Sequence, residues 1–308
     1  MRLATVEQGG KRWPGAMLDG ERVLNLEQAL GGGAGKIESM IDVIAGGTPM
    51  LEAVRAAVKG AASGGATANT IALGDVRLIA PIPVPRRNVF CVGRNYKEHV
   101  AEAAKARATE AKLPEVPHFF TKPPQSVIGP YDDIPWDAVV TQQLDYEVEL
   151  GVVIGRAGRN IPRERALDYV FGYTVINDIT GRDLQKRHGQ WFKGKGLDGS
   201  CPMGPWIVER AALPDPQRIM VRLRVNGEQR QESSTSMMIF DVREIISQLS
   251  QGLMLEPGDV IATGTPSGVG FAMSPPRFLG DGDIVETEVE GVGMLKNRIR
   301  RIEHVVAS

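Results

Sequence analysis

The segment from Leu144 to Ile154 has the strongest β-strand pattern in the chain, and it carries two acidic residues, Glu147 and Glu149. Side chains alternate between the faces of a strand, so both carboxylates are predicted to project from one face. The apolar run from Gly151 onward favours a central strand. Two partly buried carboxylates repel each other unless a cation lies between them, and magnesium suits such oxygen ligands. The alternative is the polar face of an edge strand.

A third carboxylate strengthens the metal hypothesis. Gly172 to Asn177 is predicted to be a buried strand that leads into Asp178, and a helix-like stretch follows. If helical geometry begins near Asp178, then Asp178, Arg182 and Gln185 share one helix face. A guanidinium beside a metal suits a substrate carboxylate because it can donate two parallel hydrogen bonds. The alternative makes Asp178 a helix cap and Arg182 its solvated partner.

Two glycine-rich segments are candidates to complete this site. Gly194-Lys195-Gly196 is expected to be a loop, in which the lysine can approach a ligand closely. The segment 264–270, which includes Thr265, follows a predicted strand and lacks the Gly-Lys-Ser/Thr ending of a P-loop. Its hydroxyl and backbone N–H groups are suited instead to hold a carboxylate.

His99 and Glu102 lie three residues apart in a predicted helix and therefore share a face. Glu102 can orient the imidazole and raise its basicity, which makes His99 a candidate general base. The irregular segment 107–117 is a candidate lid over the site. The alternative is an exposed helical ion pair. Only 4 histidines occur in the chain, which argues against a multi-histidine metal site.

Residues 1–80 are predicted to form a small N-terminal α/β domain. Short strands are expected from Arg2 to Glu7 and from Gly15 to Leu26, joined by turns at Gly9-Gly10 and Asp19-Gly20 and followed by one or two helices within Ile41 to Lys59. Glycine-rich breaks are expected at 31–33 and 63–65. The domain boundary is placed at a stiff proline-rich linker, Pro81, Pro83 and Pro85.

Residues 81–308 are predicted to form the catalytic domain. Its predicted strands outnumber its helices and do not alternate with them regularly, which favours an α+β fold with mixed sheets over a doubly wound sheet. Within it, Asn226-Gly227 predicts the turn of a β-hairpin.

The charge balance and the apolar runs limit the partners. Lys and Arg total 36 and Asp and Glu total 37, so the net charge of −1 gives no reason to expect nucleic acid as a partner. No apolar run approaches the roughly 18 residues that cross a bilayer, and no secretory signal is apparent. We therefore expect a cytoplasmic protein without a membrane partner. Its two cysteines, Cys91 and Cys201, are expected to be buried or incidental thiols.

Several stretches, in this order and spacing, resemble the fumarylacetoacetate hydrolase family over roughly the last three-quarters of the chain. They are Val92-Gly93-Arg94-Asn95-Tyr96 with His99 and Glu102, Phe120-Thr121-Lys122-Pro123, Tyr146 to Gly151, Asn177 to Asp183, Gly194-Lys195 with Ser200-Cys201-Pro202, and Gly264-Thr265-Pro266. The resemblance is to the subgroup of acylpyruvate hydrolases and hydroxymuconate isomerases. The aspartate ligand of the founding enzymes, expected near Asn95, has no obvious counterpart, which argues against fumarylacetoacetate itself as substrate.

This resemblance implies a mixed β-sandwich or β-roll catalytic domain, a homodimer and bound Mg²⁺ or Mn²⁺. The metal ligands would be Glu147, Glu149 and Asp178. His99, Glu102 and Lys195 would be catalytic, and the substrate-binding residues would be Arg182, Gln185, Thr265, Arg94 and Tyr96.

The activity that the resemblance implies is cleavage of a carbon–carbon bond in an acylpyruvate or other β-diketo acid. The metal would polarise the 2-oxo group, Lys195 and Arg182 would stabilise the enolate, and His99 would activate water. The alternatives are isomerisation of a hydroxymuconate-type diacid or of 2-hydroxyhepta-2,4-diene-1,7-dioate, or decarboxylation of oxaloacetate, at the same site. A binding protein that keeps the fold without catalysis is an alternative of another class.

Overall fold

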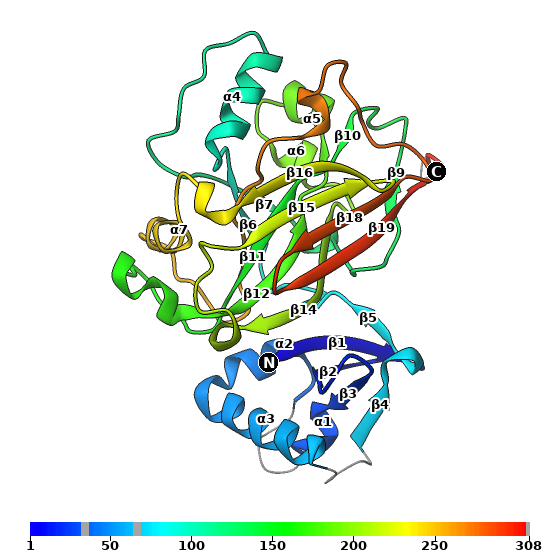
Figure 1. The fold of residues 1–308 in the computed structure, drawn as a ribbon, viewed down its shortest axis with the longest axis vertical. Helices are drawn as coiled ribbons and strands as arrows, with labels where there is room; N and C mark the ends of the chain where they lie inside the picture. Colours follow the sequence, from blue (N-terminus) through cyan, green and yellow to red (C-terminus); the bar gives the residue numbers. More distant parts are fainter. Residues whose placement is uncertain (32–36, 64–68, 306–308) are drawn as a thin grey trace.

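A computed structural model describes residues 1–31, 37–63 and 69–305. Most of the glycine-rich breaks expected at 31–33 and 63–65 lie outside these residues. The described strands form two large mixed sheets and one small one, and helices cover their ends and one side (Figure 1). The predicted α+β fold with mixed sheets is confirmed.

The larger sheet runs through the whole molecule. Its order is β4 (Thr70–Ala72), β3 (Arg22–Asn25), β2 (Lys11–Met17), β1 (Arg2–Gln8), β14 (Cys201–Glu209), β12 (Val170–Asn177), β11 (Val148–Ile154), β17 (Val260–Ala262), β6 (Val89–Gly93) and β7 (His118–Lys122), with β5 (Arg77–Ile79) beside β1 and β8 (Val127–Ile128) beside β14. Most neighbours are antiparallel, whereas β6 pairs with β17 in parallel. Every residue of β11 is buried, as expected for a central strand.

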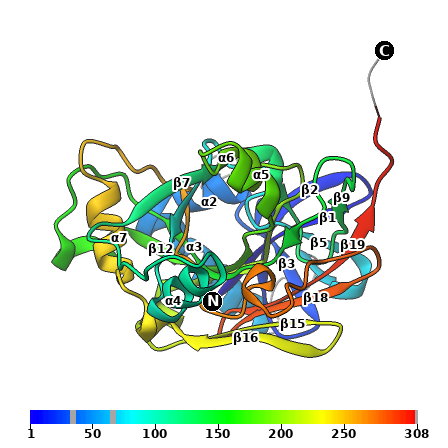
Figure 2. The ribbon, with the colours of Figure 1, turned by 90° about the horizontal axis from the view of Figure 1, so that it is seen from above.

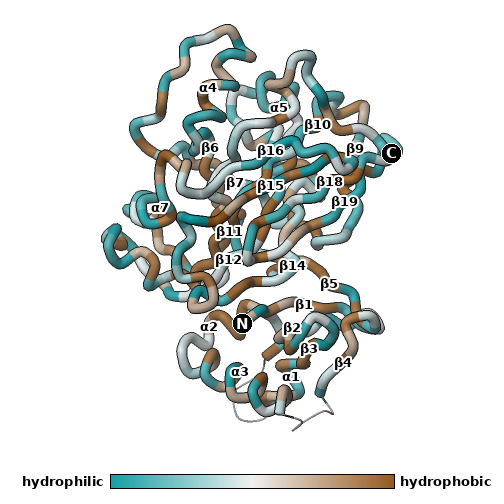
Figure 3. The backbone as a smooth tube through the Cα atoms, viewed as in Figure 1, coloured by the Kyte–Doolittle hydropathy of each residue, from teal (hydrophilic) through white to brown (hydrophobic). Residues whose placement is uncertain are grey.

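The second sheet packs against one face of the first. Its order is β16 (Glu228–Ser234), β15 (Met220–Val225), β18 (Ile284–Val289), β19 (Gly293–Arg301) and β9 (Ile134–Trp136). One apolar cluster joins Leu150 and Val175 of the larger sheet to Leu223 and Leu295 of the second sheet. Figure 3 shows that β11, β12 and β14, which border this apolar cluster, consist largely of hydrophobic residues. The predicted hairpin turn is confirmed, because β15 and β16 pair on either side of Asn226-Gly227.

The N-terminal segment lies at one end of the molecule, next to β14 (Figure 1). Its helices are α1 (Leu26–Ala29), α2 (Met40–Ala45) and α3 (Gly47–Ala62). The predicted turn at Asp19-Gly20 is confirmed, since it separates β2 from β3 and the carboxylate of Asp19 accepts hydrogen bonds from the N–H groups of Glu21 and Arg22. β1 pairs with β14 through Leu3 and Ile207, and α2 shares an apolar cluster with the larger sheet. The domain boundary near residue 80 stays a prediction.

The expected continuous strand from Leu144 to Ile154 is wrong at one point. Leu144–Asp145 forms β10, which pairs with β13 (Thr180–Gly181) in a separate sheet, and β11 begins at Val148. Asp145 causes the break, because its carboxylate accepts the next residue's N–H at 2.9 Å. Glu147 therefore stands in a bend, where strand alternation does not place it.

Three further helices lie at the upper end of the sheets and a fourth lies at one side (Figure 1): the three are α4 (Lys97–Ala106), α5 (Arg182–Arg187) and α6 (Phe192–Lys195), and the fourth is α7 (Val242–Leu249). Seen from above, α4 lies on one side and the α5–α6 pair on the other (Figure 2). The 3₁₀ segments η4 (Arg163–Tyr169) and η7 (Gly270–Ala272) lie beside α7 and α4, respectively. Within the described part of the chain, no helix combines the length and apolarity needed to cross a membrane. Both cysteines are buried free thiols, as expected.

Candidate active site

Three buried carboxylates gather where β11 and β12 meet the upper end of the sheet. Glu147 stands just before β11, Glu149 lies within it, and Asp178 directly follows β12. The backbone N–H of Asp178 donates to the carbonyl of Glu147 at 2.9 Å, which fixes the two segments together. One oxygen from each carboxylate lies within 4.8 Å of the others, and none of the three residues is more than 5% exposed. The expected convergence of these side chains is present.

Cations from three elements reach two of the acidic residues, Glu147 and Asp178. Lys195 Nζ lies 2.8 Å from Glu147 and 2.7 Å from Asp178. Lys122 Nζ, at the end of β7, lies 2.8 Å from the other oxygen of Asp178. Arg182 Nη1 lies 2.7 Å from Glu147. Burial alone would raise the pKa of Glu147. The charges of Lys195 and Arg182 outweigh this effect and lower that pKa to about 2.

Glu149 differs from its two neighbours. Among the described residues it has no ion-pair partner, and its carboxylate accepts one hydrogen bond, from the N–H of Gly264 at 2.7 Å. Burial, followed by the nearby carboxylates of Asp178 and Glu147, raises the pKa of Glu149 well above its usual value. A buried carboxylate in this position needs a positive charge close by if it is to stay ionised.

The donor set fits a hard divalent cation. Its three candidate ligands are all carboxylates, the type of ligand that Mg²⁺ and Mn²⁺ prefer. With Asp145, which pairs with Arg182, four buried carboxylates face the cationic side chains of Lys122, Arg182 and Lys195. One negative charge is thus in excess, and it belongs to Glu149. The site therefore lacks positive charge at the place where the three candidate ligands meet.

Two local expectations about this site were wrong. The helix that carries Arg182 and Gln185 begins at Arg182 rather than near Asp178, because the intervening residues form β13. Lys195 ends the short helix α6 rather than lying in a loop. A Cβ on Gly194 would lie 2.6 Å from the backbone N of Gln185, so only glycine lets α6 approach α5 this closely.

The segment 264–271 binds carboxylates, as its composition predicts. The carboxylates that it binds are side chains of the protein itself. The backbone N–H of Gly264 donates to Glu149, that of Gly268 donates to both oxygens of Glu102 at 3.1 and 2.9 Å, and that of Gly270 donates to Asp145 at 2.8 Å. One loop thereby fixes acidic residues from β10, β11 and α4 relative to one another.

His99 and Glu102 form the expected pair on α4. His99 Nδ1 lies 2.9 Å from Glu102 Oε1, and the imidazole is 8% exposed. Since Glu102 is also bound by Gly268, the pair is tied to the loop that binds Glu149. The alternative of an exposed helical ion pair does not describe this buried and anchored arrangement. Whether the segment 107–117 acts as a lid stays a prediction.

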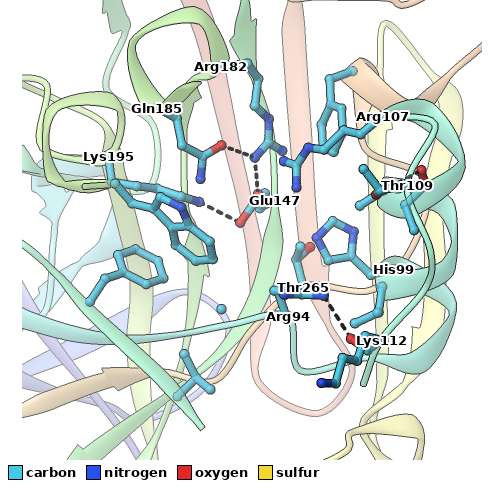
Figure 4. Close-up of a pocket in the computed structure, with 18 of the residues that line it drawn as sticks. Arg94, His99, Arg107, Thr109, Lys112, Glu147, Arg182, Gln185, Lys195 and Thr265 are labelled. Carbon is cyan, nitrogen blue, oxygen red and sulfur yellow. Dashed lines mark hydrogen bonds and ion pairs between the residues drawn. The ribbon is translucent and has the colours of Figure 1, made fainter. Parts of the chain in front are cut away.

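These side chains surround a cavity of about 390 Å³ (Figure 4). The residues expected from the sequence that line it are Arg94, His99, Glu147, Arg182, Gln185, Lys195 and Thr265. Thr265 Oγ1 accepts a hydrogen bond from Gln231 at 2.8 Å, and Gln185 accepts one from Arg182 at 3.3 Å. Tyr96, expected to bind substrate, instead lies in the apolar core with its hydroxyl unpartnered.

Several residues of the site were not identified from the sequence. The cavity wall also contains Arg107 and Phe271, together with Phe120 and Trp191, whose place in the cavity wall or in the core the sequence left open. Lys122 lay within a stretch that carried the family resemblance, and that was the available signal for it. For Arg107 and Phe271 no sequence signal existed, because the fold brings together α4 and a segment more than a hundred residues away.

A mixed α+β sandwich with an acidic triad, buried cations and a histidine–glutamate pair around one cavity defines an enzyme with a candidate metal site. A family model for the fumarylacetoacetate (FAA) hydrolase C-terminal domain matches residues 88–300. The chain belongs to the fumarylacetoacetate hydrolase family, as its sequence motifs predict.

Similar proteins carry several activities. The chain is 44% identical over 308 residues to oxaloacetate tautomerase YisK of Bacillus subtilis, covering 97% of this chain and 100% of that one. A solved fumarylacetoacetate hydrolase from Exiguobacterium antarcticum is 43% identical with a TM-score of 0.80, covering 98% of this chain and 100% of its own. Maleylpyruvate hydrolase from Sphingobium is 30% identical with a TM-score of 0.77, over the same shares of the two chains.

Proposed function

We propose that this protein is a metal-dependent enzyme that interconverts the enol and keto forms of a small 2-oxo carboxylic acid of the oxaloacetate type. One observation carries the proposal: Glu149 lies uncompensated close to Glu147 and Asp178, and Glu147 and His99 line the same cavity. The tautomerase name of the 44% identical relative supports isomerisation of an enolisable acid better than the carbon–carbon hydrolysis that we placed first from sequence.

Glu147, Glu149 and Asp178 would hold the cation, which we expect to be Mg²⁺ or Mn²⁺. When bound, such an ion acts as a Lewis acid that polarises the 2-oxo group and makes the neighbouring carbon more acidic. The protein's own contribution is to hold the acid in place. Arg182 has an unpartnered buried Nη2, and Gln185 and Thr265 provide further polar groups on the cavity wall.

The reaction moves one proton between carbon and oxygen. In the direction of the enol, His99 would accept a proton from the carbon next to the 2-oxo group, and the electron pair of the broken C–H bond would move to the oxygen. Lys195, on the cavity wall, would stabilise that negative oxygen, which then takes up a proton. In the reverse direction His99 returns the proton to carbon. Glu102 accepts a hydrogen bond from His99 Nδ1, which leaves Nε2 to carry the proton.

Hydrolysis of a β-diketo acid is the second candidate. The observation that favours it is the same His99–Glu102 pair, because an oriented imidazole can take a proton from water as well as from carbon. The structural similarity to a maleylpyruvate hydrolase supports this candidate. Decarboxylation of oxaloacetate would use the same stabilised enolate without needing His99 as a base.

The test compares three reactions on one purified protein with Mg²⁺, with Mn²⁺ and with EDTA. Ketonisation of enol-oxaloacetate is followed by ultraviolet absorbance, pyruvate release by a coupled assay, and acylpyruvate cleavage by loss of the diketone absorbance. We expect ketonisation to be fastest, to require metal, and to fall about 10²–10⁴-fold in His99→Asn. Faster acylpyruvate cleavage would favour hydrolysis, and metal-independent ketonisation would refute the proposal.

A further inference from the structure

Arg107 places a positive charge in the cavity that no acidic residue of the described chain neutralises. Its side chain has neither an ion pair nor a hydrogen bond among the described residues, and its guanidinium lies over the ring of Phe271 at 5.1 Å. Arg182 lies over the same ring at 4.6 Å. Glu147, the carboxylate whose charge acts on this guanidinium, is already paired with Arg182 and Lys195.

The position of Arg107 is fixed by the end of α4. The N–H groups of Ala108 and Thr109 donate to the carbonyls of Lys105 and Ala104, and Ala108 adopts a φ of 52°. These two bonds form a Schellman motif, which sets the direction of the chain at the helix end. Glu102, one turn earlier, is bound to the loop that leads into Phe271. Arg107 is therefore held at the cavity wall from both sides.

Like charges surround Arg107. Although Arg107 as a whole is exposed, partial burial of its guanidinium, together with Arg182 and Arg94, lowers the pKa of this group below its usual value. Arg94 also lines the cavity, and its side chain donates a hydrogen bond to the carbonyl of Lys112 at 2.9 Å. Glu110 and Lys112 lie on the exposed rim and carry opposite charges. Guanidinium groups that repel each other at a cavity wall are typical of a site for an anion.

We infer that Arg107, with Arg94 beside it, forms an anion subsite that binds the distal carboxylate of the substrate, so that the enzyme prefers 2-oxo dicarboxylic acids to 2-oxo monocarboxylic acids. This inference rests on the proposed function, since it assigns the 2-oxo end of the same molecule to the triad and Lys195. Figure 4 shows Arg107 entering from α4, across the cavity from Lys195. The cavity of about 390 Å³ is at the small end for ligand sites, which suits a short diacid.

The test uses two variants. Arg107→Met keeps a long side chain without the charge, and Arg107→Lys keeps the positive charge without the planar guanidinium group. Lys105→Met is the matched control, because it removes an exposed cation from the same helix end without facing the cavity. For each variant, kcat/KM is measured for ketonisation of enol-oxaloacetate and for C3 proton exchange of 2-oxobutanoate in D₂O. Calorimetry with Mg²⁺ present gives the Kd of malate and of lactate, two stable acids that differ by one carboxylate.

We expect Arg107→Met to lower the ratio of kcat/KM for the diacid to kcat/KM for the monoacid by about 10- to 100-fold, which is the size of effect that the loss of a charge-assisted hydrogen bond causes. Most of this change should be a higher KM for oxaloacetate. The preference for malate over lactate should fall equally, Arg107→Lys should restore part of it, and Lys105→Met should not alter it. An unchanged malate preference in Arg107→Met would overturn the subsite. If the unaltered enzyme turns over neither acid, the proposed function fails, while the malate comparison still decides the role of Arg107.

Discussion

Glu147 and Glu149 lie two residues apart with carboxylate oxygens within 4.8 Å of each other, yet among the described side chains only Glu147 has cationic partners. Glu147→Gln should therefore destabilise the metal-free protein by about 3–5 kcal/mol, because it removes one of the two buried carboxylates that pair with each of Lys195 and Arg182. Glu149→Gln should instead stabilise the metal-free protein, on the order of 1–3 kcal/mol, because it removes an uncompensated buried charge.

Urea unfolding of both variants in EDTA measures this difference, and repeating it with Mg²⁺ gives the second half of the prediction. Mg²⁺ should raise the stability of the unaltered protein and have little effect on either variant. Equal destabilisation by the two substitutions would contradict the asymmetry between the glutamates.

The metal-free protein should lose stability as the pH rises above about 4.5. In the folded state, burial raises the pKa of Glu149 well above the ordinary value of 4.5. A raised folded-state pKa contributes stability that is fully present below the unfolded pKa and is lost as the pH rises through the folded pKa. Melting temperatures in EDTA from pH 5 to pH 8 should therefore fall relative to Glu149→Gln.

Mg²⁺ should reverse that loss, so the increase in melting temperature that it causes should grow over the same pH range. Glu147 acts in the opposite direction and at lower pH, because its pKa of about 2 gives stability that is lost as the pH falls from 4.5 toward 2. A Mg²⁺ effect that is independent of pH would show that Glu149 does not control the charge of the site.

The sequence predicted the acidic triad better than it predicted the local backbone around it. The residue types were enough to predict a metal site, because two glutamates stand at alternate positions of an apolar segment and an aspartate stands at the end of another strand. The bend at Asp145 depends on a hydrogen bond from the N–H of Gly270, and the late start of α5 depends on one that the N–H of Arg182 donates to the carbonyl of Gln143; in each case the partner is distant in sequence. No local pattern encodes such partners.

The same limit applies to the cavity wall and to the strand order. Arg107 reads as a basic residue at the end of a helix, and Phe271 as one aromatic residue in a loop. They become parts of a site only because Glu102 binds Gly268 and brings α4 against η7. Likewise, the pairing of β1 with β14 joins segments about two hundred residues apart, and only the assembled sheet reveals it.

Lys122 and Lys195 both pair with Asp178, but they should differ in their contribution to catalysis. Each lysine is fully or almost fully buried, so Lys122→Met and Lys195→Met should each cost about 3–5 kcal/mol of stability. Lys195 also lines the cavity, whereas Lys122 does not. Lys195→Met should therefore lower kcat by about 10²–10³-fold, while Lys122→Met should lower it by less than about tenfold. Steady-state kinetics below the melting temperature of each variant measures this, and an equal loss of kcat would refute the distinction.

Glu102 should act through His99 rather than on the substrate. Glu102→Gln keeps an acceptor for the N–H of Gly268 but removes the charge beside Nδ1 of His99. We expect kcat to fall about 10–100-fold with little change in KM, and the pH–rate profile to shift, because the imidazole loses its carboxylate partner. Glu98→Gln on the exposed face of α4 is the control. A change in KM alone would assign Glu102 to substrate binding instead.

Gly93 is required by the ring of Trp191, and this pair gives the sharpest test of the cavity wall. A Cβ on Gly93 would lie 2.1 Å from Cζ3 of Trp191, whose ring packs edge-on against Phe120 at a centroid distance of 5.4 Å. Gly93→Ala should therefore displace the indole, shift its fluorescence, raise KM and cost about 1–3 kcal/mol of stability. In Trp191→Leu the neighbouring space opens, so adding Gly93→Ala to that variant should cost much less than it does in the unaltered protein. Additive losses in this double-mutant cycle would mean that Gly93 is needed for its backbone conformation and not for the space that Trp191 occupies.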